Sequence, residues 1–353
     1  MSRAAAMGEG AAGPTATARA VSDGRTLRVM TYNVRYFGHP TRGLASTGAA
    51  FSRIARSIAA LDPLPDFVCL QEVETQSIRS TSINRLWHPE ETQIERVITE
   101  VHAALALAGR PSRYAAHYFP AHRYKLTKRT NIYTTGLAVL ARDTFAVGHH
   151  NAGSPEDITH RQRAKKLKQT RICAHVSVTH EGGFTLDLFN THLSLPSVFS
   201  REFWTGDARM GFSPNQLAEA RALADFVDRE KRGPHFVVVG DFNALPGSPV
   251  DRYLREERGF VDAFSRVQGF SETEARAYPT AGFLNLRMHL DHVYSSPGLE
   301  WLDFAGTHPF GEEGAFAGLS DHVPLIARFR VPLSSMGGSA PLSSMGGSAP
   351  QTP

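Results

Sequence analysis

The sequence predicts an α/β protein in which two mixed β-sheets pack face to face between outer layers of helices. Short runs of apolar and β-branched residues recur along the chain, and several, such as residues 235–239, are apolar on both faces. Such strands need cover on both sides. Segments with helical periodicity lie between them and provide part of this cover. Together these observations predict a four-layer α/β/β/α sandwich.

The predicted elements follow one another irregularly. Strands are expected at residues 27–33, 67–72, 136–142, 171–178, 184–192, 235–239, 289–294 and 325–331. Apolar residues recur at helical spacing in residues 51–61 and 92–108, and Gly109 follows the second segment as a stop signal. Ser213 and Gln216 form a predicted capping box, with Pro214 at the first position of the helix that follows.

One large domain is expected over residues 26–331, because polar motifs spread between Asn33 and His322 must converge. The chain has 353 residues, 41% of them hydrophobic and 20% charged, which is typical of a globular protein with a sizeable core. Residues 1–25 predict a disordered leader. Residues 332–353 contain a nine-residue repeat and predict a flexible low-complexity tail.

The sequence predicts a cytoplasmic monomer. No apolar run approaches the roughly 18 residues of a membrane span, and residues 1–25 lack the apolar core of a signal peptide. A start upstream of Met1 would leave secretion open. Cys69 and Cys173 lie inside apolar runs and are expected to be reduced core thiols.

Basic residues are concentrated, although the formal net charge is only +4. One run without acidic residues consists of Arg161, Arg163, Lys165, Lys166, Lys168 and Arg171. A second consists of Arg123, Lys125, Lys128 and Arg129. Basic patches raise the local concentration of anionic substrates. A solvated loop is the alternative interpretation of each run.

Polar side chains stand where several of the apolar runs stop. These residues are Asn33, Glu72, His192, Asp241, Asn243, Asp291, Asp321 and His322. Taken alone, each is typical of a turn, a surface charge or a solvated histidine. Together they place carboxylates, carboxamides and imidazoles at the ends of strands, which is a costly arrangement in a core and a rigid scaffold for a site.

In this order, the motifs resemble those of the endonuclease/exonuclease/phosphatase superfamily, which has the DNase I-like fold. The resemblance covers residues 26–331 and implies the same four-layer sandwich and a phosphoester hydrolase. Residues 290–299, with the sequence LDHVYSSPGL, are similar to bacterial members without an assigned substrate.

A metal site is expected because hydrolysis of a phosphate ester requires neutralised phosphate oxygens and an aligned water. Hard oxygen ligands suit Mg²⁺, with Mn²⁺ as its substitute. We expect Glu72 and Asp321 to bind the metal and Asn33 to coordinate or orient it through its carboxamide oxygen. The sequence has no Cys/His cluster with zinc spacing, so zinc is not expected.

The resemblance also implies roles for the remaining residues. Asp241 is expected to orient or deprotonate the attacking water, and Asn243 to hold that water or a phosphate oxygen. Asp291 is expected to fix the tautomer of His322 and stabilise its cation. His322 would bind or protonate a phosphate oxygen, and His192 would contact phosphate or protonate the leaving group. Which histidine is the acid stays open.

The fold does not select the substrate, because it is shared by enzymes that act on DNA, RNA, inositol phosphates and phospholipids. Arg171 and Trp204 are candidate substrate contacts. Trp204 lies in residues 195–212, where aromatic rings alternate with arginines, and such rings stack on bases or enter a lipid headgroup region. The basic runs favour nucleic acid as the substrate.

Two alternatives remain. The first is a phosphodiesterase or phosphatase acting on a phospholipid headgroup, an inositol phosphate or another small phosphoester, with peripheral lipid contact. The second is a non-catalytic binding module on the same fold. It is disfavoured because the polar residues expected of the enzymes are all present.

Overall fold

The computed structural model describes residues 26–35, 48–74, 93–121, 125–127, 130–131, 135–160, 170–180, 183–196, 209–283 and 286–332. The predicted leader and residues 333–353 of the predicted tail lie outside this part of the chain. So do residues 161–169 of the first basic run, most of the second run, and Trp204.

The first sheet has the strand order β16-β17-β1-β2-β6-β3. Its strands are β1 (Thr26–Asn33), β2 (Phe67–Glu74), β3 (Tyr114–Pro120), β6 (Thr135–Arg142), β16 (Glu300–Asp303) and β17 (Leu325–Arg330). The sheet is mixed, because β1 runs parallel to β2 and antiparallel to β17.

The second sheet has the order β12-β15-β11-β10-β9-β7, with β8 paired to β9. Its strands are β7 (Phe145–His150), β8 (Glu156–Asp157), β9 (Ile172–His180), β10 (Thr185–His192), β11 (Phe236–Asp241), β12 (Val261–Asp262) and β15 (Asp291–Ser295). Here β10 and β11 are parallel, whereas β15 is antiparallel to β11. Two small hairpins lie apart, formed by β4 (Lys125–Thr127) with β5 (Thr130–Asn131) and by β13 (Ala281–Phe283) with β14 (Leu286–Met288).

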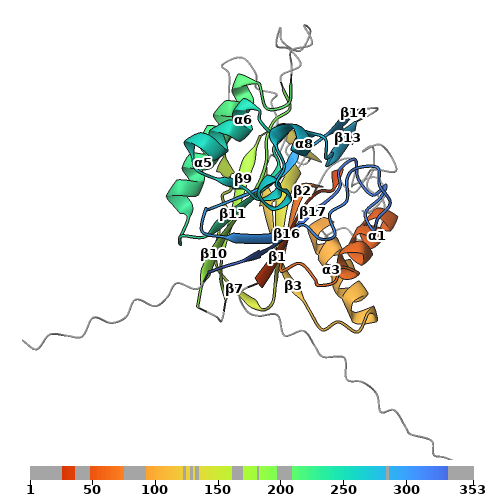
Figure 1. Ribbon diagram of the computed structural model, residues 1–353. Helices are drawn as coiled ribbons and strands as arrows, with labels where there is room; N and C mark the ends of the chain where they lie inside the picture. The colour runs from red at the N-terminus through yellow and green to blue at the C-terminus, as the bar shows by residue number, and fades with distance from the viewer. Residues whose placement is uncertain are drawn as a thin grey trace, which may run out of the picture.

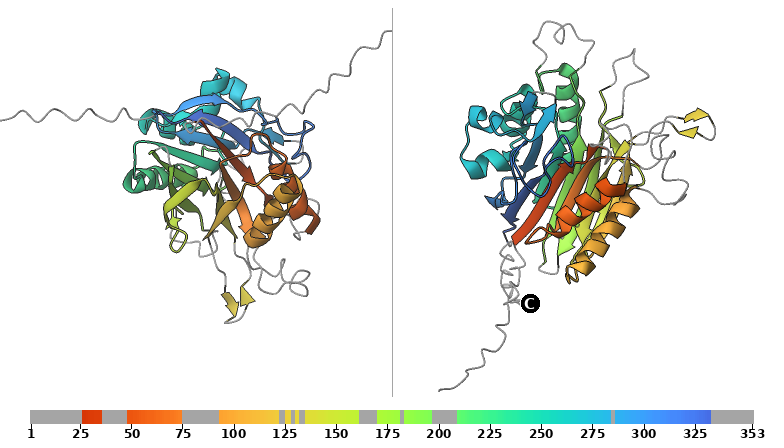
Figure 2. Two further views of the ribbon diagram at one scale, coloured as in Figure 1. Left: turned by 90° about the horizontal axis from the view of Figure 1, so that it is seen from below. Right: turned by 90° about the vertical axis from the view of Figure 1, so that its right-hand side faces the viewer.

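Helices cover the outer faces of both sheets, as Figure 1 shows. On the first sheet, α1 (Gly48–Ala59) and α3 (Gln93–Leu107) pack their apolar faces against β1, β2 and β6. On the second sheet, α5 (Pro214–Glu230), α6 (Pro249–Arg252) and the π-helical turn η3 (Tyr253–Glu257) do the same. Two short helices, α7 (Ala263–Gln268) and α8 (Glu272–Arg276), follow. The predicted four-layer sandwich is confirmed, and Figure 2 shows its layers from two further directions.

The core between the sheets consists mainly of apolar side chains. Phe67 of β2 contacts Phe145 of β7 across the interface, with ring centroids 4.7 Å apart. Both cysteines are free and buried, as expected from the sequence. Among the described residues, no helix combines the length and the apolar character needed to cross a membrane.

Strand direction determines where the polar side chains meet. Asn33 and His192 lie at the ends of β1 and β10, and Asp241 ends β11. The expectation that every polar motif follows an apolar run is wrong for two of them: Asp291 begins β15, and the Asp321–His322 pair precedes β17. Because β15 and β17 run antiparallel to β11 and β1, their starts lie at the same edge of the sandwich as the ends of the other strands.

Gly240 allows the close approach of β10 and β11 beside this edge. Its φ is 146°, and a Cβ at this position would lie 1.9 Å from the backbone oxygen of Thr191. A larger residue would therefore separate the two strands that carry His192 and Asp241.

Candidate active site

Asp241 lies at the centre of the polar cluster. Its Oδ2 accepts a hydrogen bond from Asn33 Nδ2 at 3.1 Å and lies 3.4 Å from His192 Nε2 and 3.7 Å from His322 Nε2. Its Oδ1 accepts from the backbone N–H of Asn243 at 2.9 Å. The carboxylate is buried. The structure therefore brings together residues from β1, β10, β11 and the loop before β17.

His322 is oriented by Asp291. His322 Nδ1 lies 2.8 Å from Asp291 Oδ2, which also accepts a hydrogen bond from Thr280 Oγ1 at 2.7 Å. Burial alone would lower the pKa of His322, but the carboxylates of Asp291 and Asp241 outweigh it and raise this pKa to about 10. His322 is thus held as a cation with Nε2 directed toward Asp241. Thr280 was not singled out in the sequence, where nothing distinguishes it from other threonines.

His192 has the opposite electrostatic setting. Burial lowers its pKa well below the usual value, and the positive charges of Arg171 and His322 lower it further. His192 is therefore neutral at pH 7. Burial raises the pKa of Asp241, an effect that the His322 cation opposes.

The carboxylates predicted to bind metal lie beside this cluster. Glu72 Oε1 is 3.9 Å from His192 Nε2. Burial raises the pKa of Glu72, and the negative charge of Asp321 raises it further. A divalent cation between them would relieve this repulsion. Glu72, Asp321 and the Asn33 carboxamide present oxygen atoms, and this donor set fits Mg²⁺ or Mn²⁺.

A different group of buried side chains also places possible metal-ligand atoms close together. Among the described residues, Asp241, Asp291 and His322 form one group with possible ligand atoms within 4.8 Å of one another. Their mutual contacts fit an acid–base group better than a metal cage, because His322 Nδ1 already contacts Asp291. We therefore keep Glu72, Asp321 and Asn33 as the candidate ligands.

In a second such group, Asp251, Asp262 and His292, both carboxylates and His292 Nε2 form other contacts, the latter with the backbone oxygen of Ala244 at 2.7 Å. Asp251 forms an ion pair with Arg255 and accepts from Tyr294 Oη at 2.8 Å. Asp262 caps the start of α7. These residues tie helices to the second sheet.

Arg35 is a site residue that the sequence analysis missed. Its Nη1 lies 2.6 Å from Asp321 Oδ2, and its backbone N–H donates to Asn33 Oδ1 at 3.0 Å. Ser320 Oγ donates to the backbone oxygen of Asn33 at 2.7 Å and so joins the two segments. The signal was present in the sequence, because a basic residue stands two positions after the candidate ligand Asn33.

Backbone conformation also distinguishes this cluster. Within the described chain, the non-glycine residues with positive φ are Arg35 (44°), Glu72 (56°) and Asn243 (47°). The left-handed region costs an L-residue about 1–2 kcal/mol, less for asparagine, and such residues gather at functional sites. All three lie in the candidate site, where surrounding contacts hold them.

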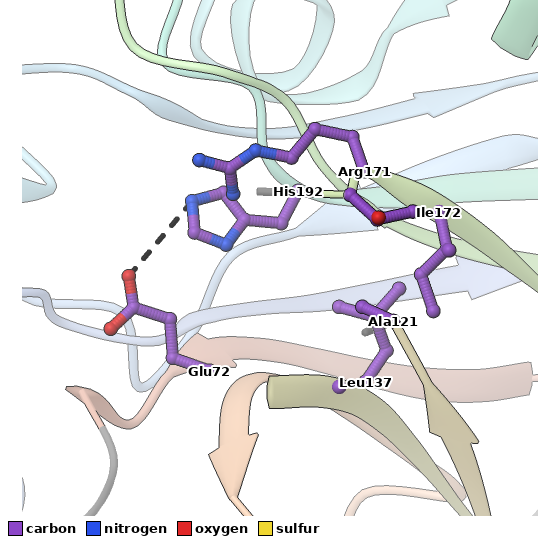
Figure 3. A pocket seen from close by; sticks show the side chains of 8 residues that line it. Glu72, Ala121, Leu137, Arg171, Ile172 and His192 are labelled. Atoms are coloured by element: carbon purple, nitrogen blue, oxygen red, sulfur yellow. Dashed lines mark ion pairs between the residues drawn. The ribbon is translucent and has the colours of Figure 1, made fainter. Parts of the chain in front are cut away.

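Arg171 borders a small pocket beside Glu72 and His192 (Figure 3). Its guanidinium lies alongside the His192 ring, while Ala121, Leu137 and Ile172 form an apolar side. Arg171 is only 9% exposed, and its Nε has no hydrogen-bond partner. A buried cation with an unused donor is a suitable contact for a substrate anion.

Comparison with known proteins identifies the family of the chain and solved structures that share its fold. A family model described as the Endonuclease/Exonuclease/phosphatase family matches residues 30–322. The solved structure of an endonuclease/exonuclease/phosphatase from Beutenbergia cavernae is similar, with a TM-score of 0.58 and 21% identity over 87% of this chain and 72% of that chain.

Two further solved structures share the fold. The human Nocturnin catalytic domain with bound sulfate anion has a TM-score of 0.53 at 20% identity, covering 86% of this chain and 94% of its own. A mannosyl-6-phosphatase of Bacteroides thetaiotaomicron has a TM-score of 0.52 at 16% identity, covering 86% and 99%. No curated protein sequence matches this chain.

Proposed function

Because the chain belongs to the endonuclease/exonuclease/phosphatase family, we propose that it is a Mg²⁺-dependent phosphodiesterase that acts on nucleic acid. Members of this family are typically phosphoester hydrolases that use divalent metals. One observation carries the proposal: a single oxygen of Asp241 lies within 3.7 Å of Asn33 Nδ2, His192 Nε2 and His322 Nε2, beside the carboxylates of Glu72 and Asp321.

In the proposed reaction, a water oxygen forms a bond to phosphorus while the bond to the leaving oxygen breaks in line with it. Asp241 accepts the proton of this water, and Asn243 helps to align it. The His322 cation, held by Asp291, stabilises a charged phosphate oxygen. His192 is neutral and donates a hydrogen bond from its N–H to the leaving oxygen, which takes its proton from solvent water as the bond to phosphorus breaks.

Mg²⁺ held by Glu72, Asp321 and Asn33 would neutralise phosphate charge as a Lewis acid. Arg35 is ion-paired with Asp321. Arg171 is a buried cation with an unpartnered Nε, which supports an anionic substrate such as nucleic acid.

A small phosphoester is the second candidate substrate. The pocket at Arg171 favours it, because Ala121, Leu137 and Ile172 limit the space beside His192. The structurally similar mannosyl-6-phosphatase is named for a phosphomonoester. The assay below therefore includes small substrates.

The proposal is tested by measuring cleavage of supercoiled plasmid and of bis-(p-nitrophenyl) phosphate with Mg²⁺, with Mn²⁺ and with EDTA. We expect metal-dependent cleavage of both by the wild type. Asp241→Asn and His322→Ala should each lower kcat by at least roughly 100-fold, because each removes an acid–base or electrostatic contribution. Both variants should keep the circular dichroism spectrum of the wild type.

Asp303→Asn is the matched control. Asp303 lies on the edge strand β16 and forms an exposed ion pair with Arg328 of β17. This variant should cleave like the wild type. Turnover of the small diester with intact plasmid would contradict nucleic acid as the substrate. A wild-type rate in Asp241→Asn would contradict the role assigned to Asp241.

A further inference from the structure

β2 contains a bulge at the residue that carries the candidate metal ligand. Leu70 pairs with Ala138 and Val73 with Gly136, so Gln71 and Glu72 together stand opposite a single residue of β6. Glu72 is the bulge residue with left-handed φ. A bulge redirects a side chain and interrupts the hydrogen bonds of the ladder. Interrupted backbone groups inside a protein need other partners.

Asn190 of the opposite sheet contacts this bulge. Its Nδ2 donates to the backbone oxygens of Leu70 at 3.0 Å and Ala138 at 3.1 Å, so both of its amide hydrogens are used. Its Oδ1 accepts from Gln71 Nε2 at 2.7 Å. Gln71 Nε2 also donates to Thr31 Oγ1 of β1 at 2.9 Å.

These contacts cross an interface that is otherwise lined by apolar side chains. Asn190 and Gln71 are both 0% exposed. Burial of two carboxamides costs free energy unless their hydrogen bonds are satisfied, and apolar side chains could fill the same space. Filling the core therefore does not explain why Asn190 and Gln71 are polar.

The position of this polar pair supplies the explanation. Asn190 and His192 are two residues apart on β10 and face the same side of the strand. Asn190 binds the backbone of the bulge, and His192 Nε2 lies 3.9 Å from Glu72 Oε1. One strand thus fixes both the bulge and the imidazole next to its carboxylate.

We propose that Asn190 is a positioning residue that holds the β2 bulge in the conformation in which Glu72 binds a divalent cation. It acts through the backbone of Leu70 and through Gln71, without touching substrate. The inference rests on the proposed role of Glu72 as a metal ligand. It extends that proposal by assigning the metal affinity of the site to a residue of the other sheet.

The test is a Mn²⁺ titration of wild type, Asn190→Leu and Asn190→Asp, followed by the electron paramagnetic resonance signal of free Mn²⁺. Leucine keeps the branched shape and the number of side-chain heavy atoms without donors, and aspartate faces two carbonyl oxygens without donors. We expect the Kd for Mn²⁺ to rise roughly 10-fold to 100-fold in both variants, the range observed when partners of metal ligands are removed. Circular dichroism should show that both remain folded.

Asp187→Asn is the matched control. Asp187 lies on the same strand, is equally buried and contacts His175 Nε2 at 2.9 Å. Its replacement should lower stability but leave the Kd for Mn²⁺ within about twofold of the wild type. The comparison separates a general loss of stability from a change at the bulge.

Each result decides the inference. A folded Asn190→Leu variant with wild-type Mn²⁺ affinity would overturn it. If the Asn190 variants do not fold, Gln71→Met replaces them. It removes the bond to Asn190 together with the Gln71 Nε2 bonds to Thr31 Oγ1 and the Cys69 backbone oxygen, and it leaves the Asn190 contacts to Leu70 and Ala138 in place. An unchanged Kd would again overturn the inference, whereas a rise of at least about threefold supports it. Absence of Mn²⁺ binding by the wild type would overturn the proposed function together with this inference.

Discussion

Two imidazoles lie within 3.7 Å of one carboxylate oxygen of Asp241, yet their pKa values move in opposite directions. Both rings are buried, which lowers the pKa of a histidine. His322 has Asp291 as a partner and becomes a cation. His192 has Arg171 nearby and stays neutral. The chemistry expected of each histidine is therefore determined by its neighbour. The family resemblance implied Asp291 for His322, whereas the effect of Arg171 on His192 was not predicted.

A further buried pair shows the same principle away from the site. His175 Nε2 lies 2.9 Å from Asp187 Oδ1, and Asp187 Oδ2 accepts from the backbone N–H groups of Arg232 and Gly233. Burial raises the pKa of Asp187, but these hydrogen bonds outweigh it and lower the pKa below its usual value of 3.8. Ionised Asp187 therefore stabilises the fold at pH values above its unfolded pKa.

Asp187→Asn should lower the free energy of unfolding by about 3 kcal/mol near neutral pH, because it weakens the hydrogen bonds of a buried, ionised carboxylate to His175 and to two backbone N–H groups. The pKa is depressed in the folded state, so this contribution is lost as pH falls through the folded pKa, below 3.8. The difference between wild type and variant should narrow there. Urea unfolding measured at about pH 7 and at about pH 3 checks this, and an equal difference at both pH values would refute it.

The first turn of α5 links separate segments of the site. Gln216 Nε2 donates to the backbone oxygens of Ser194 at 2.8 Å and Asn243 at 2.7 Å, and its Oε1 accepts from the N–H of Gly211 at 3.0 Å. Gln216 also accepts from Ser213 N at 3.4 Å, as the predicted capping box requires. The same side chain therefore starts the helix and holds Asn243 in its left-handed conformation.

Gln216→Glu should lower kcat roughly 10-fold to 100-fold, because a carboxylate cannot donate to the two carbonyl oxygens and Asn243 would shift. The measurement is the steady-state rate of hydrolysis of bis-(p-nitrophenyl) phosphate. Gln268→Glu makes the same change at an exposed position of α7 and should have the wild-type rate. Equal rates for the two variants would show that Gln216 does not position Asn243.

At the scale of the whole molecule, the sequence was sufficient to predict the four layers. Periodicity located the buried central strands and the helices α1, α3 and α5, because burial on one or both faces leaves a direct pattern in the residues. It did not predict β3, β7 and β16, which lie at or near the edges of the sheets. The motifs identified Asp241 and His322 without structural information. The resemblance to the family is confirmed by the match over residues 30–322.

Other parts of the site could not be predicted, because they depend on contacts between distant segments. The Asn190–Gln71 bond, the Thr280 contact and the left-handed φ of Glu72 have no local pattern in the sequence. The roles of the predicted residues, including those of Asn33 and Asn243, remain predictions. The contribution of Trp204 to substrate binding also remains a prediction, since Trp204 lies outside the described residues.

The two sheets depend on each other through their shared apolar core. Phe67→Ala should lower the free energy of unfolding by about 3–5 kcal/mol, because it removes a fully buried ring that contacts Phe145 of the other sheet. Phe67→Leu should cost less, about 1 kcal/mol. Denaturant unfolding of both variants tests this, and equal losses in the two variants would contradict the expectation that leucine recovers most of the buried apolar contact.

The pairing of β1 with β17 has a consequence for a chain that is still being synthesised. β17 is the last strand of the described chain, and Asp321 and His322 stand directly before it. Ser320 reaches Asn33 across almost the whole chain. A nascent protein on the ribosome therefore carries Asn33, Glu72, His192 and Asp241 before it carries His322. On the proposed chemistry, it cannot cut the messenger RNA that encodes it until the final strand has emerged.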